Sequence, residues 1–297
     1  MKVYLAGSGR PLVRKDGTAS PLQGIIERRL FSYYYGVIGN QPDEEVWTYE
    51  GLDLFLDSGA FTAYTKGVEI RVEELAEYYH AAPHLWNVVS NLDDINGPEK
   101  NSYDNWRALL DLGVPACPVF HQGSDPAWLK KYLDETDYIF IGGLVGGSTK
   151  ALRGWLDWLW TNWLTDSDGR PVARFHGFGL TDQELMFRYP WHSVDSASWL
   201  MTGMFGSCVF ITEQGLRKVV FSEQSPEARQ VDGWHYDRLP PLQQRQVEQW
   251  VARYGVTVEQ LKESFEYRDV INASAFKEME SMGAERFINQ QMRLFDA

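Results

Sequence analysis

Acidic, amide and imidazole side chains end a series of short apolar runs in this chain of 297 residues. Asp57, Asp93 and Asp195 each end such a run, while Gln122 and His176 stand at the ends of two others. Continuous short apolar runs are typical of buried parallel strands. Because the carboxyl ends of such strands carry the chemistry in barrels and doubly wound sheets, we expect these side chains to meet in one cleft.

Three carboxyl groups in one cleft would shift one another's pKa values and suit acid–base or nucleophilic catalysis. A pair of opposed carboxylates is a standard means of substitution at an anomeric carbon, since one attacks and the other handles the leaving group's proton. The amide of Gln122 and the backbone at Gly143 match the edge of a purine, and Phe61 or Phe178 could stack on it. The residues alone indicate a barrel enzyme acting on a glycosidic or similar bond.

Each of these residues also has a purely structural explanation. A strand-end Asp can cap the next helix, Gln122 can satisfy backbone groups, Gly143 can form only a turn, and His176 can be a core histidine. The three carboxyl groups expected in one cleft favour the catalytic interpretation.

The elements that must position these groups alternate between strand and helix. Seven strand–helix units with short links indicate an α/β fold, and the chain length favours a (β/α)8 barrel of the TIM type with a C-terminal helical extension. No Gly-x-Gly-x-x-Gly motif follows the first strand, and no P-loop occurs. We expect a helix over residues 21–35 that carries Arg28 and Arg29, and we find no eighth strand.

The alternation weakens after Asp195. We expect a catalytic barrel over residues 1–225, with a hairpin insertion near 207–221, and a helical region over 226–297 packed on the barrel. Charged, amphipathic helices are predicted over residues 241–254, 258–267 and 273–294. This tail could be a lid, the surface of a homodimer or the last helices of the barrel.

The bulk composition excludes some classes of protein. A net charge of −13 argues against indiscriminate nucleic-acid binding, although it allows a local basic patch. The two cysteines, Cys117 and Cys208, indicate neither a disulfide framework nor a Cys-rich zinc site. No apolar run approaches the ~20 residues of a membrane span, and the first residues read as a strand, so we expect a cytoplasmic protein.

The ordered motifs resemble those of the tRNA-guanine transglycosylases over roughly residues 50–222. Asp57-Ser-Gly-Ala-Phe61 resembles that family's Asp-Ser-Gly-Gly-Phe/Tyr, and Phe120-His-Gln-Gly123 resembles its Val-Gln-Gly. Ile141-Gly-Gly-Leu-Val-Gly-Gly147 is similar to its Ile-Gly-Gly-Leu-Ala-Val-Gly, but one residue shorter. His176-Gly-Phe-Gly179 is similar to its Met-Gly-Val-Gly, and Val194-Asp195 stands where the family has Phe-Asp-Cys.

This resemblance implies a base-exchange enzyme on a (β/α)8 barrel. Asp195 would attack C1′ of the target nucleotide, form a covalent glycosyl-enzyme and release guanine, while Asp57 would be the general acid–base. The implied base-binding residues are Ser58, Phe61, Asp93, Gln122, Gly143, Leu144 and His176. Phe61 and His176 would sandwich the ring, and the target base must leave the stack to be reached.

Two departures from the family pattern change the expected nucleic acid. The chain lacks the family's Cys-x-Cys-x-x-Cys and His zinc site, and the segment after Asp195 lacks its Arg-rich stretch. The chain looks closer to the compact, zinc-poor paralogues of phages and bacterial islands, which insert 7-deazaguanines into DNA. The expected partners are therefore a free 7-deazaguanine base, such as 7-cyano-7-deazaguanine, and double- or single-stranded DNA, with tRNA as the second choice. No cofactor, no zinc and no membrane partner are expected, and a phage-encoded enzyme would act in the host cytoplasm.

Contacts to phosphates are expected from a basic loop and from the hairpin. Arg10, Arg14 and Lys15 fall within six residues of the loop, and Arg217 and Lys218 lie on the hairpin. Binding through these charges would weaken with added salt. The alternative is that all five are ordinary solvated charges.

Three other functions stay open. The chain could be a tRNA-guanine transglycosylase with a degenerate C-terminus, a non-catalytic nucleic-acid-binding subunit of a modification complex, or an unrelated barrel hydrolase of sugars or nucleosides. Asp57, Asp93 and Asp195 together argue against a binding-only protein, which has no need of an attacking carboxylate.

Overall fold

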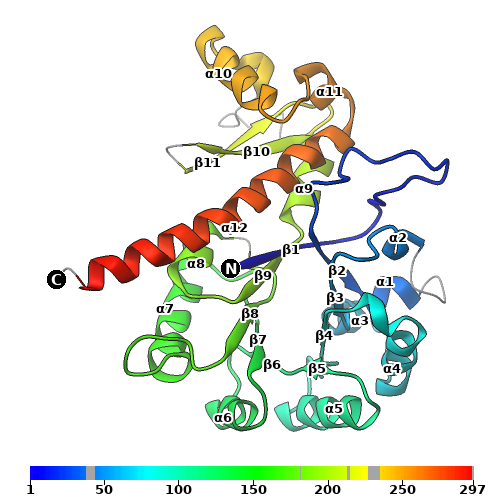
Figure 1. The fold of residues 1–297 in the computed structure, drawn as a ribbon, viewed down its shortest axis with the longest axis vertical. Helices are drawn as coiled ribbons and strands as arrows, with labels where there is room; N and C mark the ends of the chain where they lie inside the picture. The colour runs from blue at the N-terminus through cyan, green and yellow to red at the C-terminus, as the bar shows by residue number, and fades with distance from the viewer. Residues whose placement is uncertain (38–43, 181, 213–214, 227–234, 296–297) are drawn as a thin grey trace. The chain divides into compact units, whose positions relative to one another are not determined.

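The computed structural model describes residues 1–37, 44–180, 182–212, 215–226 and 235–295 (Figure 1). The chain forms two compact units. The first comprises Met1–Pro11, Arg28–Ser196 and Glu285–Ala297, and the second comprises Leu12–Glu27 and Ala197–Ala284. The hairpin that we expected as an insertion in the barrel therefore belongs to the second unit.

Nine parallel strands form one sheet in the first unit, in the spatial order β5-β4-β3-β2-β1-β9-β8-β7-β6. The strands are β1 (Lys2–Ala6), β2 (Arg28–Ser32), β3 (Asp53–Asp57), β4 (Val88–Ser90), β5 (Ala116–Cys117), β6 (Val119–His121), β7 (Tyr138–Gly142), β8 (Arg174–Gly177) and β9 (Ser193–Ser196). Only Pro118, which has no N–H to donate, separates the two edge strands β5 and β6 in the chain. The sheet is therefore a nearly closed parallel barrel, which is compatible with the TIM type.

Helices follow the strands and lie outside the ring that the strands form (Figure 1). They are α1 (Tyr33–Val37), α2 (Glu44–Trp47), α3 (Ala60–Lys66), α4 (Val72–Ala81), η1 (Pro83–Leu85), α5 (Glu99–Asp111), α6 (Pro126–Glu135), α7 (Thr149–Leu159) with its π-helical continuation η2 (Trp160–Leu164), and α8 (Gln183–Arg188). Asp125 caps α6, because its carboxylate accepts the Ala127 N–H at 2.9 Å. Asp182 caps α8, because its carboxylate accepts the Leu185 N–H at 3.2 Å.

The helix predicted over residues 21–35 is wrong. Residues Arg28–Ser32 instead form β2, which pairs in parallel with β1 and β3 and is the strand that we could not find in the sequence. Two arginines concealed it, since buried parallel strands are usually continuous apolar runs. Arg29 is nonetheless fully buried, and its guanidinium lies over the Phe31 ring at 5.1 Å.

A buried ion pair between Arg29 and Glu45 stabilises the start of the first unit. Arg29 Nη2 lies 2.9 Å from Glu45 Oε1, and the same carboxylate accepts the backbone N–H groups of Gly9 and Arg10. Removing one partner of a buried pair leaves the other charge uncompensated, at a cost of about 3–5 kcal/mol. We expect Arg29→Ala to lower the free energy of unfolding by this amount in chemical denaturation.

The control for this prediction is Arg107→Ala, which removes an exposed partner of Glu135. Exposed pairs contribute about 0–1 kcal/mol, so this variant should unfold almost like the wild type. Equal losses in the two variants would contradict the importance that we give to the buried pair.

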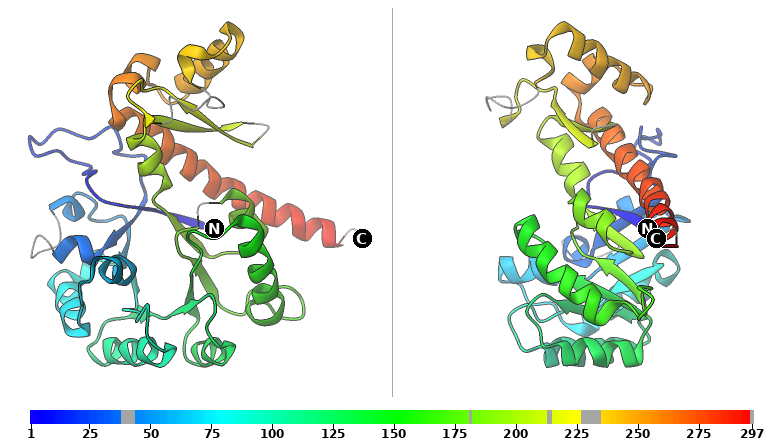
Figure 2. Two further views of the ribbon diagram at one scale, coloured as in Figure 1. Left: turned by 180° about the vertical axis from the view of Figure 1, so that it is seen from behind. Right: turned by 90° about the vertical axis from the view of Figure 1, so that its left-hand side faces the viewer.

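In the second unit, α9 (Ser198–Met204) precedes an antiparallel hairpin of β10 (Ser207–Thr212) and β11 (Gly215–Val220), as predicted. Then come η4 (Tyr236–Arg238), α10 (Pro241–Ala252), α11 (Val258–Glu263) and α12 (Phe265–Phe295), of which the residues from Glu285 onward belong to the first unit. Figure 2 shows the gold and orange α10 and α11 beside the yellow hairpin. Their shared core is apolar: Cys208, Phe210, Val219, Phe221, Val247, Val251, Leu261 and Ile271.

Within the described residues, no helix combines the length and the apolar character needed to cross a lipid bilayer.

Large side chains fill the inside of the strand ring. This cluster contains Tyr4, Ala6, Leu30, Phe55, Val119, Tyr138 and Phe140. Because side chains alternate along a strand, the residue two positions after an inward one also faces inward, one layer nearer the carboxyl end. Asp57 therefore faces inward two positions after Phe55, and His121 faces inward two positions after Val119. The apolar cluster, which we call the apolar plug, thus lies beneath a layer of ionisable groups.

Candidate active site

Asp57 ends β3 on a turn that only glycine fits. Its Oδ2 accepts the Gly59 N–H at 3.1 Å, and its Oδ1 accepts the Ser90 hydroxyl at 3.3 Å. Gly59 has a φ of +75°, and a Cβ there would lie 2.5 Å from Ser32 Oγ. Burial and the charge of Asp195 raise the pKa of Asp57 to about 6, although these hydrogen bonds oppose the rise. Asp57 is therefore poised to gain and lose a proton near neutral pH.

Asp195 lies on β9 and is only 6% exposed. Its Oδ1 accepts the Gly179 N–H at 2.7 Å and lies 3.2 Å from His176 Nε2. Its charge raises the pKa of Asp57, so the two carboxyl groups lie within electrostatic reach of each other. Two carboxyl groups with different surroundings are what a reaction with one nucleophile and one acid–base requires.

His176 is fully buried on β8 beneath Asp195. Its Nδ1 lies 2.7 Å from Ser193 Oγ, which in turn lies 2.7 Å from the Tyr138 hydroxyl oxygen. Three aromatic rings enclose the imidazole, with centroids at 4.9–5.1 Å: Phe55, Phe140 and Phe178. The structure thus directs His176 toward Asp195 and the apolar plug, whereas the sequence suggested a ring for stacking.

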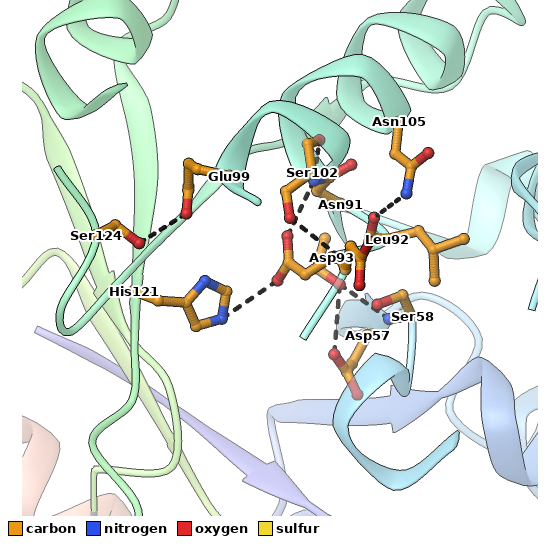
Figure 3. Close-up of polar contacts among 12 residues, drawn as sticks. Asp57, Ser58, Asn91, Leu92, Asp93, Glu99, Ser102, Asn105, His121 and Ser124 are labelled. Atoms are coloured by element: carbon orange, nitrogen blue, oxygen red, sulfur yellow. Dashed lines mark hydrogen bonds and ion pairs between the residues drawn. The ribbon is translucent and has the colours of Figure 1, made fainter. Parts of the chain in front are cut away.

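Asp93 follows β4 and belongs to a second polar group at the same edge of the sheet (Figure 3). Its Oδ1 accepts a hydrogen bond from Asn91 Nδ2 at 2.9 Å, and its Oδ2 lies 3.6 Å from His121 Nε2. Burial above all, with the charges of Glu99 and Asp57, raises the pKa of Asp93 well above its usual range. Burial also lowers the pKa of His121, so near pH 7 the imidazole is neutral.

Two residues near Asp93 received no role from the sequence. His121 could have been assigned one, because it stands two positions after the inward-facing Val119. Glu99 begins α5 and accepts hydrogen bonds from the hydroxyl groups of Ser124 (2.7 Å) and Tyr132 (3.2 Å), and burial raises its pKa. Its place depends on the path of the loop after β4, which no periodic pattern shows.

The other predicted base-binding residues follow β3, β6 and β7: Ser58, Phe61, Gln122, Gly143 and Leu144. Ser58 and Leu144 are buried, whereas Gln122 is exposed and Phe61 is 62% exposed. Gly143 has a φ of +79°, and a Cβ there would lie 2.9 Å from Gln122 Cβ. Phe61, Gln122 and Gly143 are therefore the exposed members of this set.

The predicted phosphate contacts are divided between the two units. Arg10 belongs to the first, and Arg14, Lys15, Arg217 and Lys218 belong to the second. Arg14 forms an ion pair of 2.6 Å with Glu266, while Arg217 and Lys218 are exposed on β11. Their binding to nucleic acid stays a prediction.

Among the described residues, one group of side chains could hold a metal ion: Glu223, His235 and Asp237, whose ligand atoms lie within 4.8 Å of one another. His235 is 1% exposed, and within the described chain neither ring nitrogen has a hydrogen-bond partner. Lys262, however, binds Asp237 at 2.6 Å, and its positive charge opposes a cation there. This group belongs to the second unit, and Asp57, Asp93 and Asp195 form no such group in the part of the chain that the structure describes.

A scan of the sequence against models of known protein families finds no match, and neither does a search of curated proteins. The likeness of the strand-end motifs to tRNA-guanine transglycosylases thus stays an expectation drawn from the residues. The chemistry of Asp57, Asp93 and Asp195 and their surroundings is therefore the main guide to the function of this protein.

Proposed function

We propose that this protein is a guanine transglycosylase that replaces guanine in DNA with a 7-deazaguanine, such as 7-cyano-7-deazaguanine. The observation that carries the proposal is the pair of Asp195, held by two hydrogen bonds, and Asp57, with its pKa near 6. The ordered motifs support it. So does the fold, because β5, Pro118 and β6 counted as one interrupted strand give the eight strands of a (β/α)8 barrel.

In the first half-reaction, Asp195 attacks C1′ of the target nucleotide, and the bond between C1′ and N9 breaks. The leaving guanine takes the electron pair of that bond and receives a proton from Asp57. A carboxyl group of pKa about 6 is still about one-tenth protonated at pH 7, which suits a general acid. The product is an ester between C1′ and Asp195.

In the second half-reaction, Asp57 takes the N9 proton of the incoming base. The N9 electron pair then forms a bond with C1′, and the carboxylate of Asp195 leaves. Two displacements at C1′ retain its configuration, and the proton returns to Asp57 for the next cycle. Because one base replaces another, no outside energy source or cofactor is needed.

The polar group around Asp93 would recognise the base. Hydrogen bonds from the base would favour the ionised form of Asp93 over the neutral form that burial favours. This carboxylate offers acceptors to the two neighbouring N–H groups on a guanine edge, and exposed Phe61 offers a ring for stacking. An amide has only one acceptor oxygen, so Asp93→Asn leaves one donor of the base unpaired. We expect this variant to raise the KM for the incoming base by about 10–100-fold with a smaller change in kcat. Steady-state kinetics with varied base would measure it.

Asp104→Asn is a suitable control for Asp93→Asn, since Asp104 is an exposed partner of Lys100 on α5. Its kinetic constants should equal those of the wild type. A fall in kcat at constant KM in Asp93→Asn would assign that residue to the chemical step and contradict its role in recognition.

DNA is preferred over tRNA because the sequence lacks the Cys-rich zinc site and the Arg-rich segment of the tRNA-acting family. The exposed Arg217 and Lys218 of β11 would contact phosphates. The test is to incubate the protein and 7-cyano-7-deazaguanine separately with duplex DNA, single-stranded DNA and bulk tRNA. Each nucleic acid is then digested and analysed by nucleoside mass spectrometry.

The expected product is a modified deoxynucleoside from DNA. A modified ribonucleoside from tRNA alone would keep the chemistry and change the substrate. Free base released from mononucleosides, with no exchange into any polymer, would indicate a hydrolase and contradict the proposal. Binding of DNA without any product would favour a non-catalytic subunit.

A further inference from the structure

We propose that a buried chain of hydrogen bonds, running from Tyr138 through Ser193 to His176, orients Asp195 for attack. The three links measure 2.7, 2.7 and 3.2 Å. Tyr138, His176 and the pair of Ser193 and Asp195 lie on the adjacent strands β7, β8 and β9. The catalytic meaning of this chain rests on the proposed function, in which Asp195 is the nucleophile, but its hydrogen-bond pattern can be tested without activity.

With a neutral imidazole, the donors and acceptors allow one direction along this chain of hydrogen bonds. An attacking carboxylate can only accept, so His176 Nε2 must carry the hydrogen that points at Asp195. The Nδ1 of a neutral imidazole is then an acceptor, and the Ser193 hydroxyl donates to it. Ser193 Oγ can accept from the Tyr138 hydroxyl in turn, and burial raises the pKa of Tyr138, which keeps that hydrogen in place. A single tautomer of His176 thus satisfies every link.

The surroundings of His176 keep this arrangement rigid. The imidazole is fully buried among Phe55, Phe140 and Phe178, with the Tyr4 ring at 6.2 Å. Water cannot replace a lost partner in such a place, so the ring is held to the orientation in which both nitrogens are bonded. His176 is therefore a positioning residue that acts through Asp195.

The chain of hydrogen bonds also distinguishes the two oxygens of Asp195. Both hydrogen bonds that this carboxylate accepts in the described structure go to Oδ1, from Gly179 and from His176. Oδ2 is therefore the oxygen that attacks C1′. In the second half-reaction the same donors stabilise the charge that returns to Asp195 as it leaves C1′.

NMR spectroscopy can identify the tautomer of His176 directly. Protein labelled with ¹⁵N in its six histidines gives two-bond ¹H–¹⁵N spectra that separate Nε2–H, Nδ1–H and doubly protonated rings. The signal of His176 is assigned by its loss in His176→Gln. We expect the Nε2–H form in the wild type and a changed Nδ1 shift in Ser193→Ala. A doubly protonated or Nδ1–H ring in the wild type would overturn the proposed chain, whatever reaction the protein catalyses.

The kinetic test compares variants that break different links of the hydrogen-bond chain. His176→Phe keeps a buried ring but removes the donor to Asp195, and we expect kcat to fall ~100-fold or more at unchanged KM for the base. His176→Gln can donate through Nε2 and accept through Oε1, so it should recover roughly tenfold of that loss. Tyr138→Phe removes only the last link, and we expect a loss of about threefold or less.

Thermal unfolding of each variant shows whether it has folded, and the exposed His80→Asn is the matched control. A raised KM for the base at unchanged kcat in His176→Phe would mean that the ring nitrogens of His176 help to bind the base, and it would contradict the positioning role. Equal losses in His176→Phe and His176→Gln would also contradict it, because they would show that the donor is irrelevant. If the wild type exchanges no base, the proposed function fails, and the tautomer spectrum still decides the hydrogen-bond chain.

Discussion

Asp195→Ala is expected to abolish base exchange, with kcat falling by about 10⁴-fold or more, while DNA binding is unchanged. The reason is that no other carboxylate receives the two donors that hold Oδ1 of Asp195, namely Gly179 N–H and His176 Nε2, in the described structure. Without the proposed nucleophile, the proposed covalent intermediate cannot form. The measurement is exchange of labelled base into DNA, together with DNA binding by fluorescence anisotropy.

Asp195→Asn makes the test sharper. Its amide oxygen can accept the same two hydrogen bonds, so the site keeps its shape, but an amide does not attack C1′. A covalent complex with DNA should appear on a denaturing gel for the wild type without incoming base, and for neither Asp195 variant. Asp137→Asn, which changes an exposed carboxylate, should behave as the wild type. Residual turnover or a covalent complex in Asp195→Asn would disprove the assignment of the nucleophile.

Much of the barrel could be predicted because most of its strands are continuous apolar runs. β3 and β7 are buried on both faces, so their sequences carry the signal directly. β2 carries no such signal, because Arg29 is buried by pairing with Glu45, a residue that precedes β3 in the chain. The pattern of residues within one short segment cannot predict an ion pair with a residue from another segment.

At the site, too, positions fixed by a local pattern could be predicted, whereas contacts between distant parts of the chain could not. Asp57 and Asp195 stand at strand ends, and the alternation of side chains is enough to direct them inward. The contacts of His176 required the structure, since its partners Ser193 and Asp195 come from another strand. Glu99 reaches the site from a helix start after a loop, and its place had no sequence signal at all.

Asp57→Asn is the second variant with a large expected effect. In the proposed mechanism Asp57 donates a proton in the first half-reaction and takes one in the second, so its loss should slow both, by about 10²–10⁴-fold in kcat. Measured separately, the two half-reactions should depend on pH in opposite ways. In the wild type, kcat/KM for DNA should fall as pH rises through about 6, because the acid form of Asp57 is needed.

The value of kcat/KM for the incoming base should instead rise with pH, since the ionised form of Asp57 takes the proton. Its midpoint should lie below that for DNA, because in the proposed glycosyl-enzyme Asp195 would be an ester and would no longer raise the pKa of Asp57 by its charge. Both pH dependences should disappear in Asp57→Asn. Profiles that move in the same direction would contradict the single acid–base role.

Stability gives an independent test of the same pKa. Because burial raises the pKa of Asp57 above its unfolded value, its favourable contribution is fully present below about pH 4 and is lost as pH rises through about 6. Asp57→Asn avoids the buried charge. Relative to the wild type, it should therefore be more stable at pH 8 than at pH 4 by about 2 kcal/mol in denaturant unfolding. A variant that is more stable without the proposed acid–base residue would show that Asp57 serves catalysis and lowers the stability of the fold.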